Sequence, residues 1–449
     1  MKSHATSPFS ILTAASVLKS AGWILLFFGF AAENVQAQTP ATPTIEERLT
    51  KIEAQLSQQQ TDTTSEDEEL TKLKLELQLP PQLGSLFTGL GPAISRVYSS
   101  KRPLSIGAYG EFSYSAVQGG DRITNLTRFN PVIGFRFSNT LIFNSALSFQ
   151  NGGAVEGEGA ARVEFAYLDF LMGPETGIRV GNVLVPFGLT NLRPEPLLFP
   201  TVQRPRAETR IVPSTWHENG VLGFGKIGNV LIQGGVVNST DAARYDANTW
   251  IRSGRQNGAN ARADDPAFVL RVENLGDEAS VGGSFYVGNS AQGAAALGRA
   301  QVLLGSLHAE FRADRFSGRA MIVEGRLSDT EKIAAVTNQP VAAKVQGGYA
   351  ILSYDLLPRI SPFARSLVNS PPPPGWRELP LFVSYEQENL QTEPATGRTR
   401  LETAEHRTWT FGANYKPHPQ VVFKGDFAYR TLGESETERV VELGLGFVF

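Results

Sequence analysis

The sequence predicts an all-β fold, an antiparallel outer-membrane β-barrel of about 16 strands preceded by a coiled-coil helix. Three observations predict it. The chain opens on an apolar run typical of a secretory signal, its hydrophobic period changes from the heptad to two near residue 105, and its last alternating run ends on Phe449.

Composition narrows the class of protein. The 449 residues include 41 basic and 44 acidic side chains and no Cys. A chain with this balance lacks the excess of Lys and Arg that broad nucleic-acid binding requires, so no nucleic-acid partner is expected. The absence of Cys excludes disulfide scaffolds, thiolate nucleophiles and Cys-based metal sites.

Residues 1–37 are expected to be a signal peptide. The longest apolar run, 21–32, follows Lys2 and Lys19 and is shorter than the roughly 20 residues of a spanning helix. Val35 and Ala37 place small residues at the −3 and −1 positions of a cleavage site. The mature chain is therefore expected to be exported.

Residues 38–80 are expected to form a periplasmic coiled coil, and 81–100 a linker with Pro and Gly hinges. One heptad frame carries the apolar seam, and the polar stretch TDTTSEDEE interrupts it. The same composition also fits a partly disordered, charged tether. The seam positions are Ile45, Leu49, Ile52, Leu56, Leu70, Leu73 and Leu77.

Residues 101–449 alternate with a period of two, which is typical of strands. The number of runs is even, and several are near the 9–11 residues of a tilted spanning strand. Short and long connections alternate between them. These features together favour a transmembrane barrel. The sixteen expected strands start near residues 105, 127, 141, 162, 176, 219, 230, 266, 280, 301, 315, 343, 379, 405, 420 and 437.

The two faces of the expected strands differ in charge. One face carries Phe, Leu, Val and Tyr, as lipid contact requires, and the other carries charged residues that would line a lumen. A soluble sandwich would share the alternation but not this charge distribution. Wall residues on the charged face that are expected to contact solute are Arg136, Arg179, Arg312 and Lys424.

No catalytic set emerges from the sequence, and neither an enzyme nor a cofactor is expected. The five His show no metal-ligand spacing, and no G-x-S-x-G elbow is present. His308 lies between Ser306 and Glu310, but residues at alternate positions of a strand share a face without forming a catalytic group.

The longest gap between expected strands, 186–219, is the densest cluster of charge. Its prolines stiffen it, and its apolar residues favour a loop folded back into the barrel over a surface loop that mediates subunit contacts. Its basic residues are expected to face the pore, offset by Glu195, Glu208 and Glu218: Arg193, Arg204, Arg206 and Arg210.

The stretch AYLDFLMGPETGIRVGNVLVPFGLTN (166–191), with RPRAETRIVPSTWHENGVLGFG (204–225), resembles the phosphate-selective porin O and P superfamily. The resemblance implies a sixteen-stranded trimeric channel, and the N-terminal coiled coil resembles its DcaP-like branch. The terminal Phe449 resembles the residue that the barrel assembly machinery reads. Residues 187–225 lack the Lys cluster of phosphate-selective members.

The expected function is therefore a water-filled channel in outer-membrane lipid for small anionic solutes, phosphate or carboxylates, because Arg binds planar carboxylates bidentately. The alternative is an exported β protein without a channel, either a surface adhesin or a tether between outer membrane and cell wall.

The heptad seam generates a test. Replacing Leu49 and Ile52 with Asp puts charge in the seam and should weaken trimer crosslinking while the barrel still folds. A crosslinking pattern that the double variant leaves unchanged would show that the segment is only a tether.

Overall fold

We describe the chain from a computed structural model. It describes residues 87–100, 102–153, 159–357, 377–401, 404–433 and 436–449. The chain divides into residues 1–66 and 67–449, and every described residue belongs to the second unit. The expected signal peptide and coiled coil lie outside the described residues.

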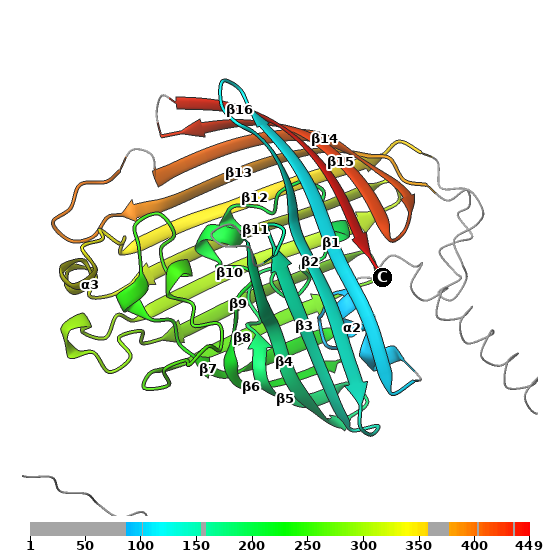
Figure 1. Cartoon of the computed structure of the whole chain (residues 1–449), viewed down its shortest axis with the longest axis horizontal. Coiled ribbons are helices and arrows are strands. Elements are labelled where there is room, and N and C mark those ends of the chain that lie inside the picture. Colours follow the sequence, from blue (N-terminus) through cyan, green and yellow to red (C-terminus); the bar gives the residue numbers. More distant parts are fainter. Residues whose placement is uncertain (1–86, 101, 154–158, 358–376, 402–403, 434–435) are drawn as a thin grey trace, which may run out of the picture. The chain divides into compact units, whose positions relative to one another are not determined.

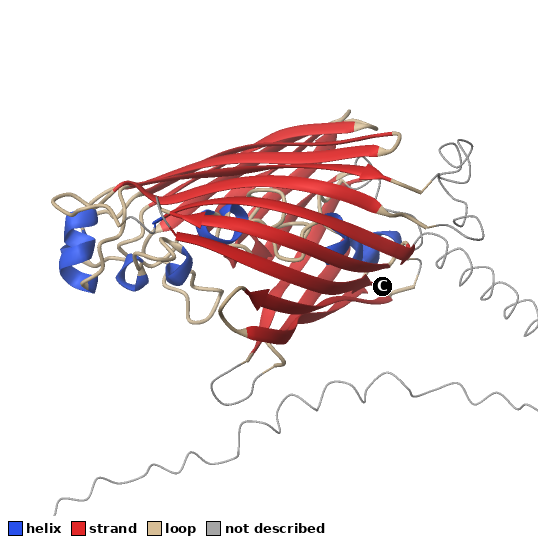
Figure 2. Ribbon diagram, turned by 90° about the horizontal axis from the view of Figure 1, so that it is seen from above, coloured by secondary structure: helices blue, strands red, loops and turns tan. Residues whose placement is uncertain are grey.

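Sixteen antiparallel strands form a closed barrel in which each strand pairs with its neighbours in sequence and β1 pairs with β16 (Figures 1 and 2). The expected fold class is confirmed, and each expected start lies within five residues of an observed one. The strands are β1 (Leu104–Val117), β2 (Arg122–Arg136), β3 (Leu141–Gln150), β4 (Ala160–Gly173), β5 (Thr176–Leu184), β6 (His217–Ile227), β7 (Val230–Asn238), β8 (Pro266–Leu275), β9 (Ala279–Gly288), β10 (Val302–Ala313), β11 (Phe316–Leu327), β12 (Lys344–Asp355), β13 (Pro380–Glu393), β14 (Glu405–His418), β15 (Val421–Leu432) and β16 (Glu436–Val448).

Side-chain exposure alternates along the strands as the two-residue period requires. On β15, Phe423 and Phe427 face outward and are 49% and 41% exposed, whereas Lys424 and Asp426 face the lumen and are each 6% exposed. On β15, apolar side chains thus face outward and charged ones face the lumen. Elsewhere the lumen face also contributes buried apolar side chains, such as Val269 of β8 and Leu304 of β10, to an internal apolar cluster.

The chain's last residue completes the barrel. Phe449 and Ala108 exchange two backbone hydrogen bonds, of 2.8 and 2.9 Å, and Phe447 lies opposite Gly110 of β1. The two edges that the chain ends would otherwise leave open are thereby paired.

The two ends of the barrel differ. Tight turns, such as those at residues 138–140 and 228–229, join most strand pairs at one end, here called the short-turn end, where the longer connection between β12 and β13 also begins and ends. At the opposite, long-loop end lie the connections 239–265 and 328–343, the second of which contains helix α3 (Thr330–Thr337). Short helical turns at the long-loop end span Ala242–Arg244, Arg252–Gly254 and Ala295–Leu297.

The segment expected as a linker contains a helix, α2 (Pro92–Ser99), which packs against β1, β2 and β3 on the lumen side near the short-turn end (Figure 1). Pro92 at its first position suits a helix start, because that position needs no N–H donor. Within the described residues, no helix combines the length and apolarity needed to cross a membrane.

The closure at Phe449 generates a test. Deleting Phe449 removes both backbone bonds to Ala108 and should reduce the amount of folded barrel while leaving export intact. Folded barrel is measured as the species that migrates differently in gels before and after boiling. Unchanged yield would show that β16 closes without its last residue.

Candidate functional site

The connection between β5 and β6, residues 185–216 and here called the inward loop, folds into the lumen. It contains the helical turns Pro196–Leu198 and Ala207–Ile211. Its backbone is held across the barrel: Asn414 donates to the Pro200 carbonyl at 2.9 Å, Arg319 to that of Leu198 at 2.6 Å, and the Val202 N–H donates to Asp426 at 2.7 Å. The expected inward folding of this segment is observed.

Apolar packing explains why the loop stays inside. Its large apolar side chains are almost fully buried, so leaving them in water would be costly. Trp216 lies 4.7 Å from the ring of Tyr286, centroid to centroid. The loop's buried apolar residues are Val185, Phe187, Leu189, Leu192, Phe199, Val202, Ala207, Ile211, Val212 and Trp216.

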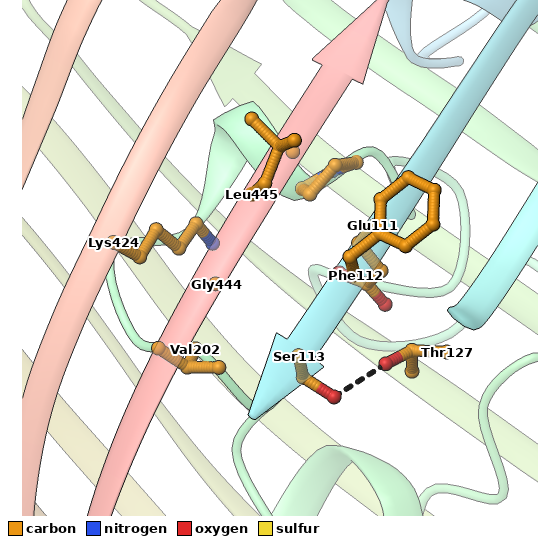
Figure 3. A pocket seen from close by; sticks show the side chains of 10 residues that line it. Glu111, Phe112, Ser113, Thr127, Val202, Lys424, Gly444 and Leu445 are labelled. Atoms are coloured by element: carbon orange, nitrogen blue, oxygen red, sulfur yellow. Dashed lines mark hydrogen bonds between the residues drawn. The ribbon is translucent and has the colours of Figure 1, made fainter. Parts of the chain in front are cut away.

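Lys424, expected to contact solute, instead fastens the loop. Its ammonium donates to the carbonyls of Phe199 and Thr201 at 2.8 and 2.9 Å and lies 4.0 Å from the centre of the Phe199 ring. Figure 3 shows Lys424 beside Val202 of the loop, in a small pocket that also contains Glu111 of β1.

Arg193 of the inward loop is paired with two carboxylates of the wall. Its guanidinium lies 3.0 Å from Glu273 of β8 and 2.8 Å from Glu310 of β10. These neighbours raise the pKa of Arg193 above its ordinary value despite its burial, so the group stays charged. The guanidinium of Arg193 thus offsets negative charge of these two wall carboxylates in the lumen.

Arg206 and Arg210 share another wall carboxylate. Glu388 of β13 is fully buried and accepts from Arg206 at 2.7 Å and from Arg210 at 3.0 Å. Arg210 also donates to the Asn248 carbonyl at 2.5 Å, which joins the inward loop to the connection 239–265. Both arginines therefore hold the loop against the wall.

The expected wall residues occupy three different environments. Arg136 donates to the carbonyls of Val97 and Tyr98 at 3.0 and 2.8 Å, at the end of α2. Arg179 is 1% exposed and makes two 2.9 Å bonds to Asp169. Arg312 is partly exposed near the short-turn end.

A different group of arginines gathers on residues 209–215 of the inward loop. Arg252 donates to the carbonyls of Thr209 and Ser214, both at 2.6 Å. Arg255 donates to those of Pro213 and Thr215 at 2.9 and 2.6 Å, and Arg204 lies 3.3 Å from the Thr215 hydroxyl.

Two further arginines complete this group, here called the arginine cluster: Arg128, Arg162, Arg204, Arg252 and Arg255. Arg162 of β4 acts electrostatically on both Arg252 and Arg255, and Arg128 of β2 acts on Arg204 and Arg252. Burial, together with the like charges of Arg252 and Arg162, lowers the pKa of Arg255 to about 9.

The cluster differs from the paired arginines because most of its members have no ion pair among the described residues. Within the described ranges, only Arg128 has a carboxylate within 4.0 Å, that of Glu111. Arg162 contacts the amide oxygen of Gln150 at 2.5 Å. Arg162, Arg252 and Arg255 are partly exposed, so water reaches them.

The sequence did not single out Arg128, Arg162, Arg252 or Arg255. The spacing of Arg252 and Arg255 gives no signal, and the pattern of residues 239–265 indicates only a long polar connection. Among the residues that the structure describes, no group of three or more His, Asp or Glu side chains has metal-binding geometry.

The barrel is similar to solved outer-membrane channels. It matches the channel DcaP of Acinetobacter baumannii with a TM-score of 0.51 and 12% identity over 80% of this chain and 100% of that one. It matches an anion-selective porin from Comamonas acidovorans with a TM-score of 0.50 and 11% identity over 77% and 99%. The fold is that of an outer-membrane porin.

The chain belongs to one family with an uncharacterised protein of Aquifex aeolicus, to which it is 30% identical over 84% of its own length and 87% of that protein. No family model matches the sequence.

The shared carboxylate of Glu388 generates a test. Glu388→Gln leaves two guanidinium groups without their counter-charge and should destabilise the inward loop by about 3 kcal/mol, measured as earlier thermal unfolding and faster proteolysis of residues 185–216. The control is Glu324→Gln, because Glu324 pairs with Arg326, which is 63% exposed. Equal effects of both substitutions would contradict a special role for Glu388.

Proposed function

We propose that the protein is a passive channel for small anionic solutes, in which the arginine cluster lines the path. The observation that carries the proposal is a contrast between arginines. Arg193, Arg206 and Arg210 are paired with wall carboxylates, whereas Arg252 and Arg255 are held by backbone carbonyls and have no carboxylate within 4.0 Å among the described residues.

Hydrogen bonds to carbonyls orient a guanidinium without neutralising it. A guanidinium has five N–H donors, and Arg252 uses the same nitrogen, Nη1, for its bonds to Thr209 and Ser214, which leaves other donors for a solute. Donors on a planar cation suit carboxylate or phosphate oxygens, and the attraction is stronger in confined water than in bulk.

The opposite wall favours the same sign of solute. Carboxylates of β8, β10 and β13 that could attract cations are occupied by Arg193, Arg206 and Arg210. These paired carboxylates are therefore less able to attract a passing cation.

Release of the solute requires that the attraction be moderate. Glu111 pairs with Arg128, and Glu164 and Glu218 act electrostatically on Arg255. Glu164 also accepts a hydrogen bond from Tyr109 at 3.1 Å, which keeps its carboxylate in place. These carboxylates weaken the attraction between the arginines and a bound anion, so the anion can leave and flux continues.

The assembly follows from the expectations of the sequence. We propose an outer-membrane location with the short-turn end facing the periplasm, a homotrimer, a periplasmic coiled coil at residues 38–80, and membership of the phosphate-selective porin O and P superfamily. The porin fold of the barrel supports this arrangement.

Planar bilayer recording of the full mature protein in a salt gradient tests the proposal. The wild type should conduct, and its reversal potential in the salt gradient should have the sign of an anion-selective channel. Arg162→Gln should shift that potential toward cations at low salt and less at 1 M, where the screening length is about 3 Å. Arg162 is the preferred position because it bonds to the neutral Gln150 amide, so its substitution removes charge without breaking an ion pair.

Two controls separate charge from structure. Arg162→Lys keeps the charge and should keep the reversal potential. Arg326→Gln removes one exposed positive charge from the outward face of β11 and should leave it unchanged. A wild-type barrel that folds but never conducts would instead favour the adhesin or tether. If Arg162→Gln shifts the reversal potential no more than Arg326→Gln does, residues other than the arginine cluster set the selectivity.

A further inference from the structure

Two glycines of the barrel wall leave room for helix α2 inside the lumen. Gly107 of β1 and Gly134 of β2 face the helix, and neither position has room for a side chain. A Cβ at Gly134 would lie 2.5 Å from the Cβ of Val97, whereas one at Gly107 would lie 2.9 Å from the Phe449 carbonyl oxygen and 3.3 Å from that of Ala93. The wall is flat where the helix lies, so α2 occupies space that would otherwise belong to the pore.

Polar side chains of the wall hold the helix. Besides the two bonds from Arg136, Asn144 of β3 donates to the Ile94 carbonyl at 2.8 Å. The Tyr98 hydroxyl donates to Asp169 of β4 at 2.5 Å. An eight-residue helix is marginal in water by itself, so α2 depends on these contacts for its structure.

The start of the helix is joined to the inward loop. Glu195 of the loop is fully buried and accepts from the Ala93 N–H at 3.2 Å, and the Gly91 N–H donates to the Leu192 carbonyl at 3.0 Å. Gly91 has no side chain because a Cβ would overlap the Glu195 carboxyl. Burial raises the pKa of Glu195 to about 7.

We propose that α2 is a displaceable plug at the short-turn mouth of the barrel, and that its withdrawal widens the pore and frees the inward loop at Glu195. The proposal rests on the proposed channel function. Helix α2 precedes β1 in the chain, so it can leave the lumen without breaking a strand pair. Withdrawal would also place the Glu195 carboxylate in lumen water, which weakens the preference for anions.

The test uses the absence of Cys from the chain. Ser95→Cys places the one thiol on the buried side of α2, where Ser95 is 3% exposed. Gly134→Val, combined with it, puts a branched side chain where Val97 lies and should expel the helix. We expect slow maleimide labelling of the single variant, fast labelling of the double variant, and a higher single-channel conductance with a smaller anion preference in the double variant.

Three further proteins make the result decisive. Adding Val97→Gly to the double variant removes the Cβ and both Cγ atoms that the new side chain meets, and should recover slow labelling and low conductance. The control is Gly305→Val combined with Ser95→Cys. A Cβ at Gly305 meets no atom within 4 Å, so this variant should keep slow labelling and low conductance. Removing residues 87–99 outright should give the high conductance without any need to displace the helix.

Wild-type conductance in the deletion variant, or in a double variant whose introduced thiol labels fast, would overturn the plug. This outcome differs from failure of the channel itself, in which every variant, the wild type included, would be silent.

Discussion

The structure depends on the closure of β1 against β16. Hydrocarbon offers no hydrogen-bond partners, so a sheet can cross it only when no strand edge stays open. Closure with sixteen strands turns one face of every strand toward lipid and the other toward a lumen that must hold charged side chains, as Lys424 and Asp426 show on β15. The polar interior and the loop that fills it follow from that constraint.

A lumen lined with charges of both signs is stable only if most of them are paired. The structure divides its arginines accordingly. Arg193, Arg206 and Arg210 neutralise wall carboxylates and thereby hold the inward loop, whereas Arg252 and Arg255 hold the same loop through its carbonyls. The first arrangement cancels charge and the second preserves it. The inward loop is thus anchored to the wall, and Arg252 and Arg255, which contact it, keep their positive charge.

The sequence predicted the features that depend on local pattern. A two-residue period and tight turns are readable over ten residues, so the sixteen strands were predicted closely, and the stiff, apolar segment 186–219 was predicted to fold inward. Pairing is not local: Arg206 meets Glu388, 182 positions away. Four loop arginines were therefore expected to face solute, and three of them are bound to wall carboxylates. Helix α2 was missed because a short segment that begins with Gly91 and Pro92 resembles a hinge, and because the glycines and polar side chains of the wall that hold it are distant in sequence.

Liposome swelling with two solutes of equal size tests the central claim most directly. Liposomes containing the full mature protein would be diluted into a small dicarboxylate or into its neutral diamide. The account predicts swelling in both solutes and faster swelling in the dicarboxylate, with the difference reduced at high salt. Equal rates at low salt, or no swelling in either solute, would contradict it.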